Sequence, residues 1–134
     1  MSKKLKINIV TPGKKSMEFE AEALITSTKE GQIEFKFNHA PIIISTIPTT
    51  TTIINDNNRE KIFTSSGIVY VKGNELKFCC DAAEMASDID KDRALKSKER
   101  AEKRLREEKN IDIERAKRAL ARANARISTI SMNN

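Results

Sequence analysis

The change of pattern that decides the fold lies in residues 69–95, which read VYVKGNELKFCCDAAEMASDIDKDRAL. The first ten of these residues alternate apolar and polar side chains on either side of the sequence KGNE at 72–75, which is typical of a β-hairpin. From Ser87 onward, the apolar residues recur every three or four positions, which is typical of an amphipathic helix. The stretch therefore predicts a β domain that ends near residue 84 and a helical segment that follows it.

The part of the chain before residue 69 contains further short strands. Residues 5–9 and 33–37 also alternate between apolar and polar side chains, and turn-forming residues separate such runs. All six aromatic residues lie within the first 78 positions, so we expect the main hydrophobic core in this half. Several short strands at regular spacing predict an antiparallel β-sandwich over residues 1–84.

The last third of the chain has the composition of helices. Neither Gly nor Pro occurs after Gly73, and Ala, Lys, Arg and Glu dominate. We expect one helix over 88–107, which starts near Ser87, and a second over 111–130, which starts at Asn110.

The two predicted helices are joined by a short link around Glu108 and Lys109, which favours an antiparallel hairpin. Their apolar seam is rich in alanine, so its burial stabilises the hairpin only modestly. The predicted fold class is α+β, with a β-sandwich at 1–84 and a helical hairpin at 85–134 that is able to move or open.

Positive charge gathers on the hairpin. Basic residues exceed acidic ones by five in residues 85–134 but only by one in residues 1–84. Arg93 and Arg100 lie on one face of the first predicted helix, and Arg122 and Arg126 lie on one face of the second. In a closed hairpin, these four arginines are predicted to form a shared basic surface. Such a cluster would suit a multiply charged anion, since guanidinium groups bind phosphates through forked contacts.

Two other interpretations of this charge are open. A solvated basic face is common near helix C-termini, where cations complement the helix dipole. Nucleic-acid binding is a second alternative, in which the sandwich would anchor a basic helical module. Residues 79–134 contain no aromatic side chain on which a base could stack, which weakens this alternative.

Stand-alone catalysis is not predicted. His39 is the only histidine, and it lies in a turn-like sequence rather than beside a nucleophile. Cys79 and Cys80 are adjacent, so they lack the spacing of metal ligands and are poorly placed to form a disulfide with each other. The four glycines do not form a phosphate-binding loop. We expect no metal site, a reducing compartment and no membrane-spanning segment.

Several short sequences, in order along the whole chain, resemble the epsilon subunit of F-type ATP synthases. They are VTP at 10–12, HAP at 39–41, SGIVYV at 66–71, AAE at 82–84, DIDKDRA at 88–94, KERAEKRL at 98–105, ID at 111–112 and RA at 115–116. The resemblance implies a non-catalytic subunit of the central stalk, the rotor of a proton- or sodium-translocating ATP synthase. The sandwich of such a subunit contacts the gamma subunit and the c-ring. The hairpin can extend to the alpha and beta catalytic subunits and inhibit ATP hydrolysis.

The resemblance also implies a location and a regulatory ligand. Such a subunit is peripheral to the cytoplasmic face of the cell inner (plasma) membrane, which it meets only through the c-ring, and it has no nucleic-acid partner. It requires no cofactor. In some bacterial members, ATP binds the folded hairpin and favours the non-inhibitory state, through a motif Ile/Leu-Asp-x-x-Arg-Ala that residues 89–94 match. The implied ATP-binding residues are Glu84, Ile89, Asp90, Arg93, Ala94, Arg100, Arg122 and Arg126.

A second set of residues is implied for contact with the rotor. Members of the family typically carry Gly-x-Leu-Gly-Ile-Leu-Pro-x-His-Ala-Pro, and residues 31–41 retain the ends of this pattern but lack its inner Gly and Pro. The predicted rotor-contact residues are Gly31, His39, Ala40 and Pro41.

Overall fold

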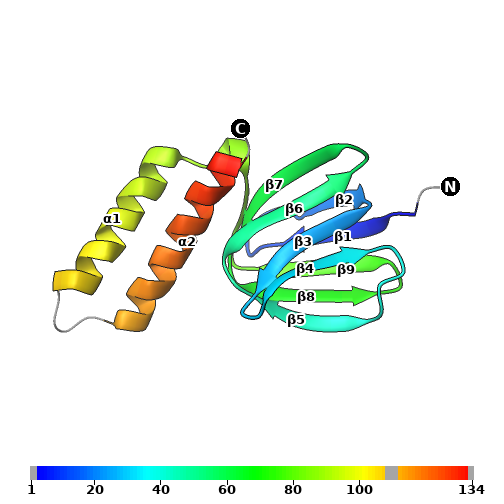
Figure 1. Cartoon of the computed structure of the whole chain (residues 1–134), viewed down its shortest axis with the longest axis horizontal. Coiled ribbons are helices and arrows are strands. Elements are labelled where there is room, and N and C mark those ends of the chain that lie inside the picture. Colours follow the sequence, from blue (N-terminus) through cyan, green and yellow to red (C-terminus); the bar gives the residue numbers. More distant parts are fainter. Residues whose placement is uncertain (1–2, 108–111, 133–134) are drawn as a thin grey trace.

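The computed structural model describes residues 3–107 and 112–132, and Figure 1 shows the arrangement of their elements. Ten strands come first, followed by a short 3-10 helix and two α-helices. The link predicted at Glu108 and Lys109 and the helix start predicted at Asn110 lie outside the described residues.

The strands form two five-stranded sheets that pack face to face. The first sheet has the order β2 (Met17–Ala21), β1 (Leu5–Val10), β9 (Glu75–Cys80), β8 (Gly67–Lys72) and β5 (Ile42–Thr46). The second has the order β10 (Ala83–Met85), β7 (Asn58–Thr64), β6 (Thr49–Asn55), β3 (Ala23–Thr28) and β4 (Gly31–Lys36). The predicted β-sandwich is confirmed. One pairing within it is parallel, that of β1 with β9, which places Ile7 opposite Leu76.

The alternating residues of the strands fill the space between the sheets, as their pattern predicts. The core side chains are at most 2% exposed in the runs that the sequence singles out: Leu5, Ile7, Ile9, Phe35, Val69, Val71, Leu76 and Phe78. Burial of a large apolar side chain is worth about 1.5–3 kcal/mol, so this core makes the sandwich the more stable part of the chain.

Each of the two α-helices is capped by an aspartate. The 3-10 helix η1 (Ala86–Asp88) leads into α1 (Lys91–Glu107), and α2 is Ile113–Met132. The carboxylate of Asp90 accepts a hydrogen bond from the backbone N–H of Arg93 at 3.1 Å, and Asp112 accepts one from Arg115 at 3.1 Å. These are N-cap contacts. The prediction that the first helix starts near Ser87 is wrong, because Ser87 belongs to the 3-10 helix and Asp90 supplies the cap.

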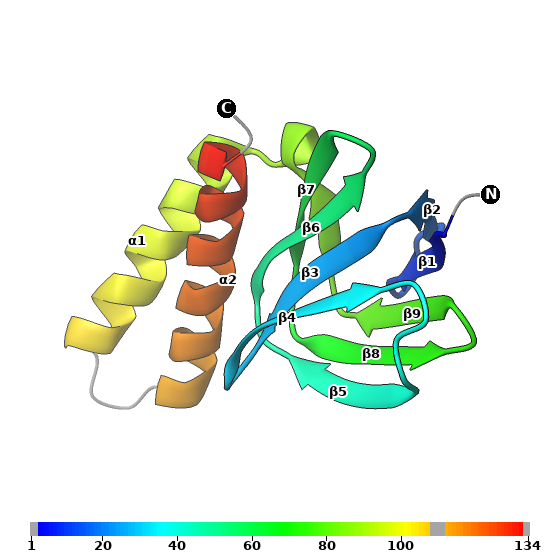
Figure 2. The ribbon, with the colours of Figure 1, turned by 45° about the vertical axis from the view of Figure 1, so that its right-hand side comes forward.

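The two helices pack against each other and form an outer layer, and α2 lies between α1 and the sandwich in both ribbon views (Figures 1 and 2). Their buried seam is made of small side chains, as the sequence predicts: Ala94, Ala101, Ala116 and Ala123 are at most 4% exposed. Leu95 and Ile113, which are large apolar residues of the same helices, remain exposed and do not contribute to this seam. Neither α-helix, over the residues described, is long and apolar enough to cross a membrane.

Candidate functional site

Helix α2 docks on a row of side chains that crosses three strands of the second sheet. In the strand register, Glu84 of β10 lies opposite Phe63 of β7, and Phe63 lies opposite Thr50 of β6. All three belong to the part of the sheet against which α2 packs. We call these three residues the docking row.

Arg126 of α2 joins the hairpin to two members of the docking row. Its Nε donates a hydrogen bond to Glu84 Oε1 at 2.6 Å, and its guanidinium carbon lies 4.3 Å from the centroid of the Phe63 ring. The Arg126 and Glu84 side chains are only 27% and 26% exposed, so solvent screens this pair less than a surface pair. Glu84 provides a carboxylate partner for Arg126 although the two residues are 42 positions apart in the sequence.

The third member of the docking row is bound one turn later along α2. The hydroxyl groups of Thr50 and Thr129 lie 2.8 Å apart. The Thr129 hydroxyl also donates to the backbone carbonyl of Ala125 at 2.8 Å, within its own helix. Since a hydroxyl group has a single proton, Thr50 must be the donor in the contact between the hairpin and the sandwich.

A cavity of about 370 Å³ lies beside this contact, where the last strand, the start of α1 and the end of α2 meet. Six of the eight predicted ATP-binding residues line it: Glu84, Ile89, Asp90, Arg93, Ala94 and Arg126. Four further residues that the sequence does not single out complete the lining: Lys14, Ala82, Asp88 and Ser97.

The remaining two predicted residues are not in this cavity. Arg100 lines a neighbouring depression of about 570 Å³ together with Asp90, Asp92, Arg93, Lys96 and Glu99. Its Nη2 donates to the Ser97 hydroxyl at 3.3 Å. Arg122 is half-buried and lines neither space.

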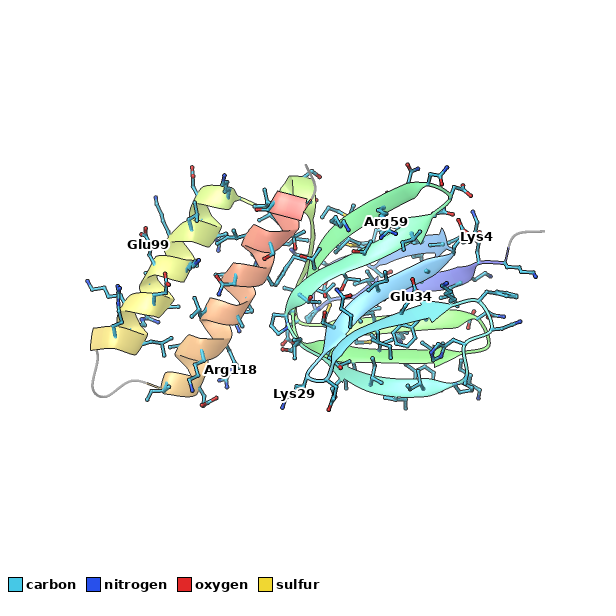
Figure 3. The ribbon with its side chains drawn as sticks, in the orientation of Figure 1. Lys4, Lys29, Glu34, Arg59, Glu99 and Arg118 are labelled. Carbon is cyan, nitrogen blue, oxygen red and sulfur yellow. The ribbon has the colours of Figure 1, made fainter. Side chains whose placement is uncertain are left out.

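Helix geometry accounts for both separations. Arg100 lies seven residues, about 10 Å of helix rise, beyond Arg93, and Arg122 lies about 6 Å before Arg126. Residues on the same face of a helix are still separated along its axis, so the four guanidinium groups do not meet at one point. Glu99, which shares the depression with Arg100, lies on the side of α1 that faces away from α2 (Figure 3).

The cavity mixes opposite charges with apolar surface. Three cationic side chains line it (Lys14, Arg93 and Arg126), and so do three carboxylates (Glu84, Asp88 and Asp90). Two of the carboxylates have partners, since Glu84 binds Arg126 and Asp90 caps α1. Ala82, Ile89 and Ala94 supply the apolar surface. Such a lining suits a ligand that has both an anionic part and a less polar part. The described residues contain no group of three or more His, Cys, Asp or Glu side chains that could hold a metal ion.

The predicted rotor-contact residues do not form one loop. Gly31 begins β4 with a positive φ of 128°, whereas His39 and its neighbours follow the other end of that strand. A strand of this length separates its ends by about 20 Å. The His39 ring packs edge-on against Phe35, with centroids 4.9 Å apart, and its Nδ1 lies 2.7 Å from the Ala40 carbonyl oxygen. These contacts hold the turn in place.

Comparison with known proteins identifies the family. Residues 4–86 match the beta-sandwich domain of the ATP synthase Delta/Epsilon chain, and residues 87–131 match the long alpha-helix domain of the same chain. The chain belongs to the ATP synthase Delta/Epsilon chain family. Membership in this family identifies a non-catalytic subunit rather than a stand-alone enzyme.

Individual relatives cover almost the whole chain. The ATP synthase epsilon chain of Clostridium novyi (strain NT) is 44% identical over 131 residues, which are 97% of this chain and 100% of the relative. That of Clostridium kluyveri is 40% identical over 131 residues, 97% of this chain and 99% of the relative. That of Desulfitobacterium hafniense (strain Y51) is 40% identical and covers 91% and 92% of the two chains.

Solved structures share the fold of this member of the Delta/Epsilon family. A chain of the Euglena gracilis mitochondrial ATP synthase, in a structure of OSCP, F1 and c-ring, aligns with a TM-score of 0.81. It is 13% identical, and the alignment covers 93% of this chain and 80% of that one. A chain of the central stalk and c-ring of the Tetrahymena thermophila mitochondrial ATP synthase aligns with a TM-score of 0.59 at 13% identity, over 96% and 95% of the two chains.

The four further lining residues differ in how clearly the sequence indicates them. Ser97 lies one helical turn after Arg93, so the spacing of the motif residues could have indicated it. Ala82 and Asp88 flank residues that were predicted. Lys14 lies in a turn far away in the sequence, and no periodicity connects it to the hairpin.

Proposed function

We propose that this chain is the epsilon subunit of the central stalk of an F-type ATP synthase, and that ATP regulates its hairpin. The sandwich binds the gamma subunit and the c-ring, and the hairpin inhibits ATP hydrolysis when it leaves the sandwich and reaches the alpha and beta catalytic subunits. ATP bound in the cavity favours the docked, non-inhibitory hairpin. Family membership supports the place in the stalk, and so does the likeness to chains of solved ATP synthase assemblies.

The observation that carries the regulatory part is the composition of the cavity. Its lining comes from the sandwich (Lys14, Ala82 and Glu84) and from the segment that runs through η1, α1 and α2. A ligand that fills such a space contacts both bodies only while they are docked. It therefore stabilises the docked state by its differential affinity, as thermodynamic linkage requires.

The contacts that hold the hairpin to the sandwich are few enough for the hairpin to separate from it. The hairpin that Figures 1 and 2 show docked is held to the sandwich by the Arg126–Glu84 ion pair, by the contact of the Arg126 guanidinium group with the Phe63 ring, and by the hydrogen bond between Thr50 and Thr129. The Ala seam lies between the helices, so the hairpin can separate from the sheet without opening its own packing. In the undocked state, Arg126 and the neighbouring basic face become available to acidic surfaces of the catalytic subunits.

The proposed function also implies where the protein is located and which ligand regulates it. The subunit is peripheral to the cytoplasmic face of the cell membrane, which it meets through the c-ring. Its regulatory ligand is ATP, and no cofactor takes part. The synthase transports protons or sodium ions. The nucleic-acid alternative receives no support from the family assignment.

Calorimetric titration of the full chain with ATP, ADP and GTP tests the regulatory part. We expect saturable heat with ATP and a marked loss of affinity in Arg93→Ala, because Arg93 lines the cavity. Arg118→Ala is the matched control: this residue is an exposed arginine of α2 that lies outside the cavity lining, and Figure 3 labels it. Absence of heat at millimolar ATP would remove the regulatory site and leave the place in the stalk unaffected.

A second variant of the same titration defines how far the ligand extends. Arg122 lines neither space in the docked state, although the resemblance implies it. If Arg122→Ala weakens ATP binding as much as Arg93→Ala does, the ligand or the α2 side chains must rearrange on binding. If it has no effect, the ligand is confined to the observed lining.

A further inference from the structure

We propose that Lys14 is an additional phosphate-binding residue of the ATP site, and that it supplies the cation through which the ligand holds the sandwich to the hairpin. This inference rests on the proposed function. It adds a residue from the sandwich to a site whose other cations, Arg93 and Arg126, both belong to the helices.

The local backbone holds Lys14 in a defined position at the edge of the cavity. Residues 11–14 form a tight turn in which the Lys14 N–H donates to the Thr11 carbonyl at 3.5 Å. Pro12 and Gly13 occupy its central positions, and the φ of Gly13 is +71°, as a type II turn requires at its third residue. Thr11 is only 8% exposed, so the turn is anchored in the sandwich.

The charges of the cavity indicate what Lys14 contributes. Arg126 is occupied by Glu84 in the docked state. Among the residues described, neither Lys14 nor Arg93 forms a salt bridge. These two cations are therefore available to a ligand without the loss of an existing ion pair. One is carried by the β1–β2 turn and the other by α1, so that a polyphosphate chain between them is attracted from both sides.

This arrangement has a consequence for regulation. Arginines that lie on the hairpin alone would bind phosphates equally well after the hairpin had left the sandwich. A lysine on the sandwich contributes only when the hairpin is docked. The contact of Lys14 with the ligand is thus part of the free energy that couples ATP binding to docking.

The neighbouring residue provides a charge-matched control. Lys15 is exposed, follows Lys14 directly and is absent from the cavity lining. Lys14→Glu and Lys15→Glu change the net charge of the protein by the same amount at adjacent positions. A difference between them therefore reports contact with the ligand rather than the long-range field.

The experiment is calorimetric titration of the full-length wild type, Lys14→Glu, Lys15→Glu and Lys14→Arg with ATP, ADP and AMP. We expect Lys14→Glu to weaken ATP binding by about tenfold or more, Lys15→Glu by less than about threefold, and Lys14→Arg to retain binding. The effect of Lys14→Glu should decrease from ATP to ADP to AMP, because a phosphate-binding residue loses partners along this series.

The outcomes separate this inference from the proposed function. Equal effects of the two charge reversals, with Arg93→Ala still abolishing binding, would overturn the role of Lys14 and leave the ATP site in place. An effect of Lys14→Glu that is the same for ATP and AMP would overturn its assignment to the phosphates. A wild-type chain that binds no ATP would overturn both. Circular dichroism and thermal unfolding of each variant establish that the sandwich is folded.

Discussion

The hydroxyl group of Thr50 donates a hydrogen bond to the hydroxyl of Thr129, 2.8 Å away and 79 positions later in the sequence. The direction follows from the proton of Thr129, which is used in the contact with the Ala125 carbonyl. Thr129 is completely buried and Thr50 only partly so. The two threonines therefore do not contribute equally to the docking of the hairpin.

Replacement of these threonines by valine should have unequal effects. Thr129→Val removes the acceptor for Thr50 from a buried site, so we expect it to weaken docking by about 1–3 kcal/mol. Thr50→Val leaves Thr129 bound to Ala125, so its cost should be about 1 kcal/mol or less. Hydrogen exchange of the α2 amides measures the opening free energy directly. Equal protection in the two variants would contradict the assigned direction.

The pairing of Arg126 with Glu84 should be the main polar contribution to docking. Arg126→Gln removes both the ion pair and the contact with the Phe63 ring, and we expect a loss of about 1–2 kcal/mol in the protection of α2. Glu84→Gln should cost less, because the ring contact persists. The Glu114–Lys117 pair is the control: both side chains are more than 60% exposed, and Lys117→Ala should be nearly silent. Similar losses for Lys117→Ala and Arg126→Gln would contradict a specific docking contact.

Gly67 should be essential to the sandwich for steric reasons. A Cβ at this position would lie 2.2 Å from the carbonyl oxygen of Cys79 and 2.7 Å from the Cβ of Cys80, on the paired strand β9. We expect Gly67→Ala to lower the free energy of unfolding by about 1–3 kcal/mol or more, because the two strands must move apart. Ser66→Ala, at an exposed neighbour, is the control. Chemical denaturation of the two variants provides the measurement, and an unchanged midpoint for Gly67→Ala would show that the strands adapt at no cost.

The two cysteines should differ in reactivity. Burial, reinforced by the negative charge of Asp81, raises the pKa of the Cys80 thiol from 9.0 to about 11, whereas Cys79 is exposed. Since the thiolate is the reactive form, we expect iodoacetamide at pH 8 to modify Cys79 rapidly and Cys80 only after unfolding. Mass spectrometry of the labelled peptides identifies the modified residue. Equal labelling in the native state would contradict the burial of Cys80.

The same pKa shift predicts a dependence of stability on pH. Between pH 9 and about 11, the unfolded chain releases the Cys80 proton while the folded chain retains it. Deprotonation therefore favours unfolding in this range, and the contribution of the protonated thiol is complete below pH 9 and is lost as the pH rises toward 11. Cys80→Ala should show a shallower loss of stability over this range than Cys79→Ala.

The sequence predicts the sandwich well because its signal is local. Val69, Val71, Leu76 and Phe78 alternate around a turn, and each is buried as the alternation requires. The parallel pairing of β1 with β9 lies beyond this reasoning, since it joins strands about 70 positions apart and depends on how the whole sandwich closes. The start of α1 is mispredicted because Ser87 and Asp90 are both suitable caps, and the 3-10 turn between them carries no distinct pattern.

The candidate site is predicted in part for a related reason. The short motif at residues 89–94 places all four of its defined members in one cavity, because they lie close together at and just before the first turn of α1. Arg100 lies two helical turns beyond Arg93 and Arg122 lies one turn before Arg126, and neither residue lines the cavity. Glu84 as the partner of Arg126, and Lys14 in the lining, arise only from the docking of the hairpin on the sandwich.

The position of the docking contacts along the chain also determines when, during synthesis on the ribosome, the hairpin is able to dock. Every member of the docking row belongs to the sandwich, whereas both residues that bind it, Arg126 and Thr129, lie in the second half of α2. The ribosome therefore completes the strands and α1 before the residues that attach the hairpin exist. During synthesis, the residues of the strands and of α1 are therefore present while those that attach the hairpin are still missing. Docking of the hairpin is thus a late event in the formation of each molecule, because it cannot precede the synthesis of Arg126 and Thr129.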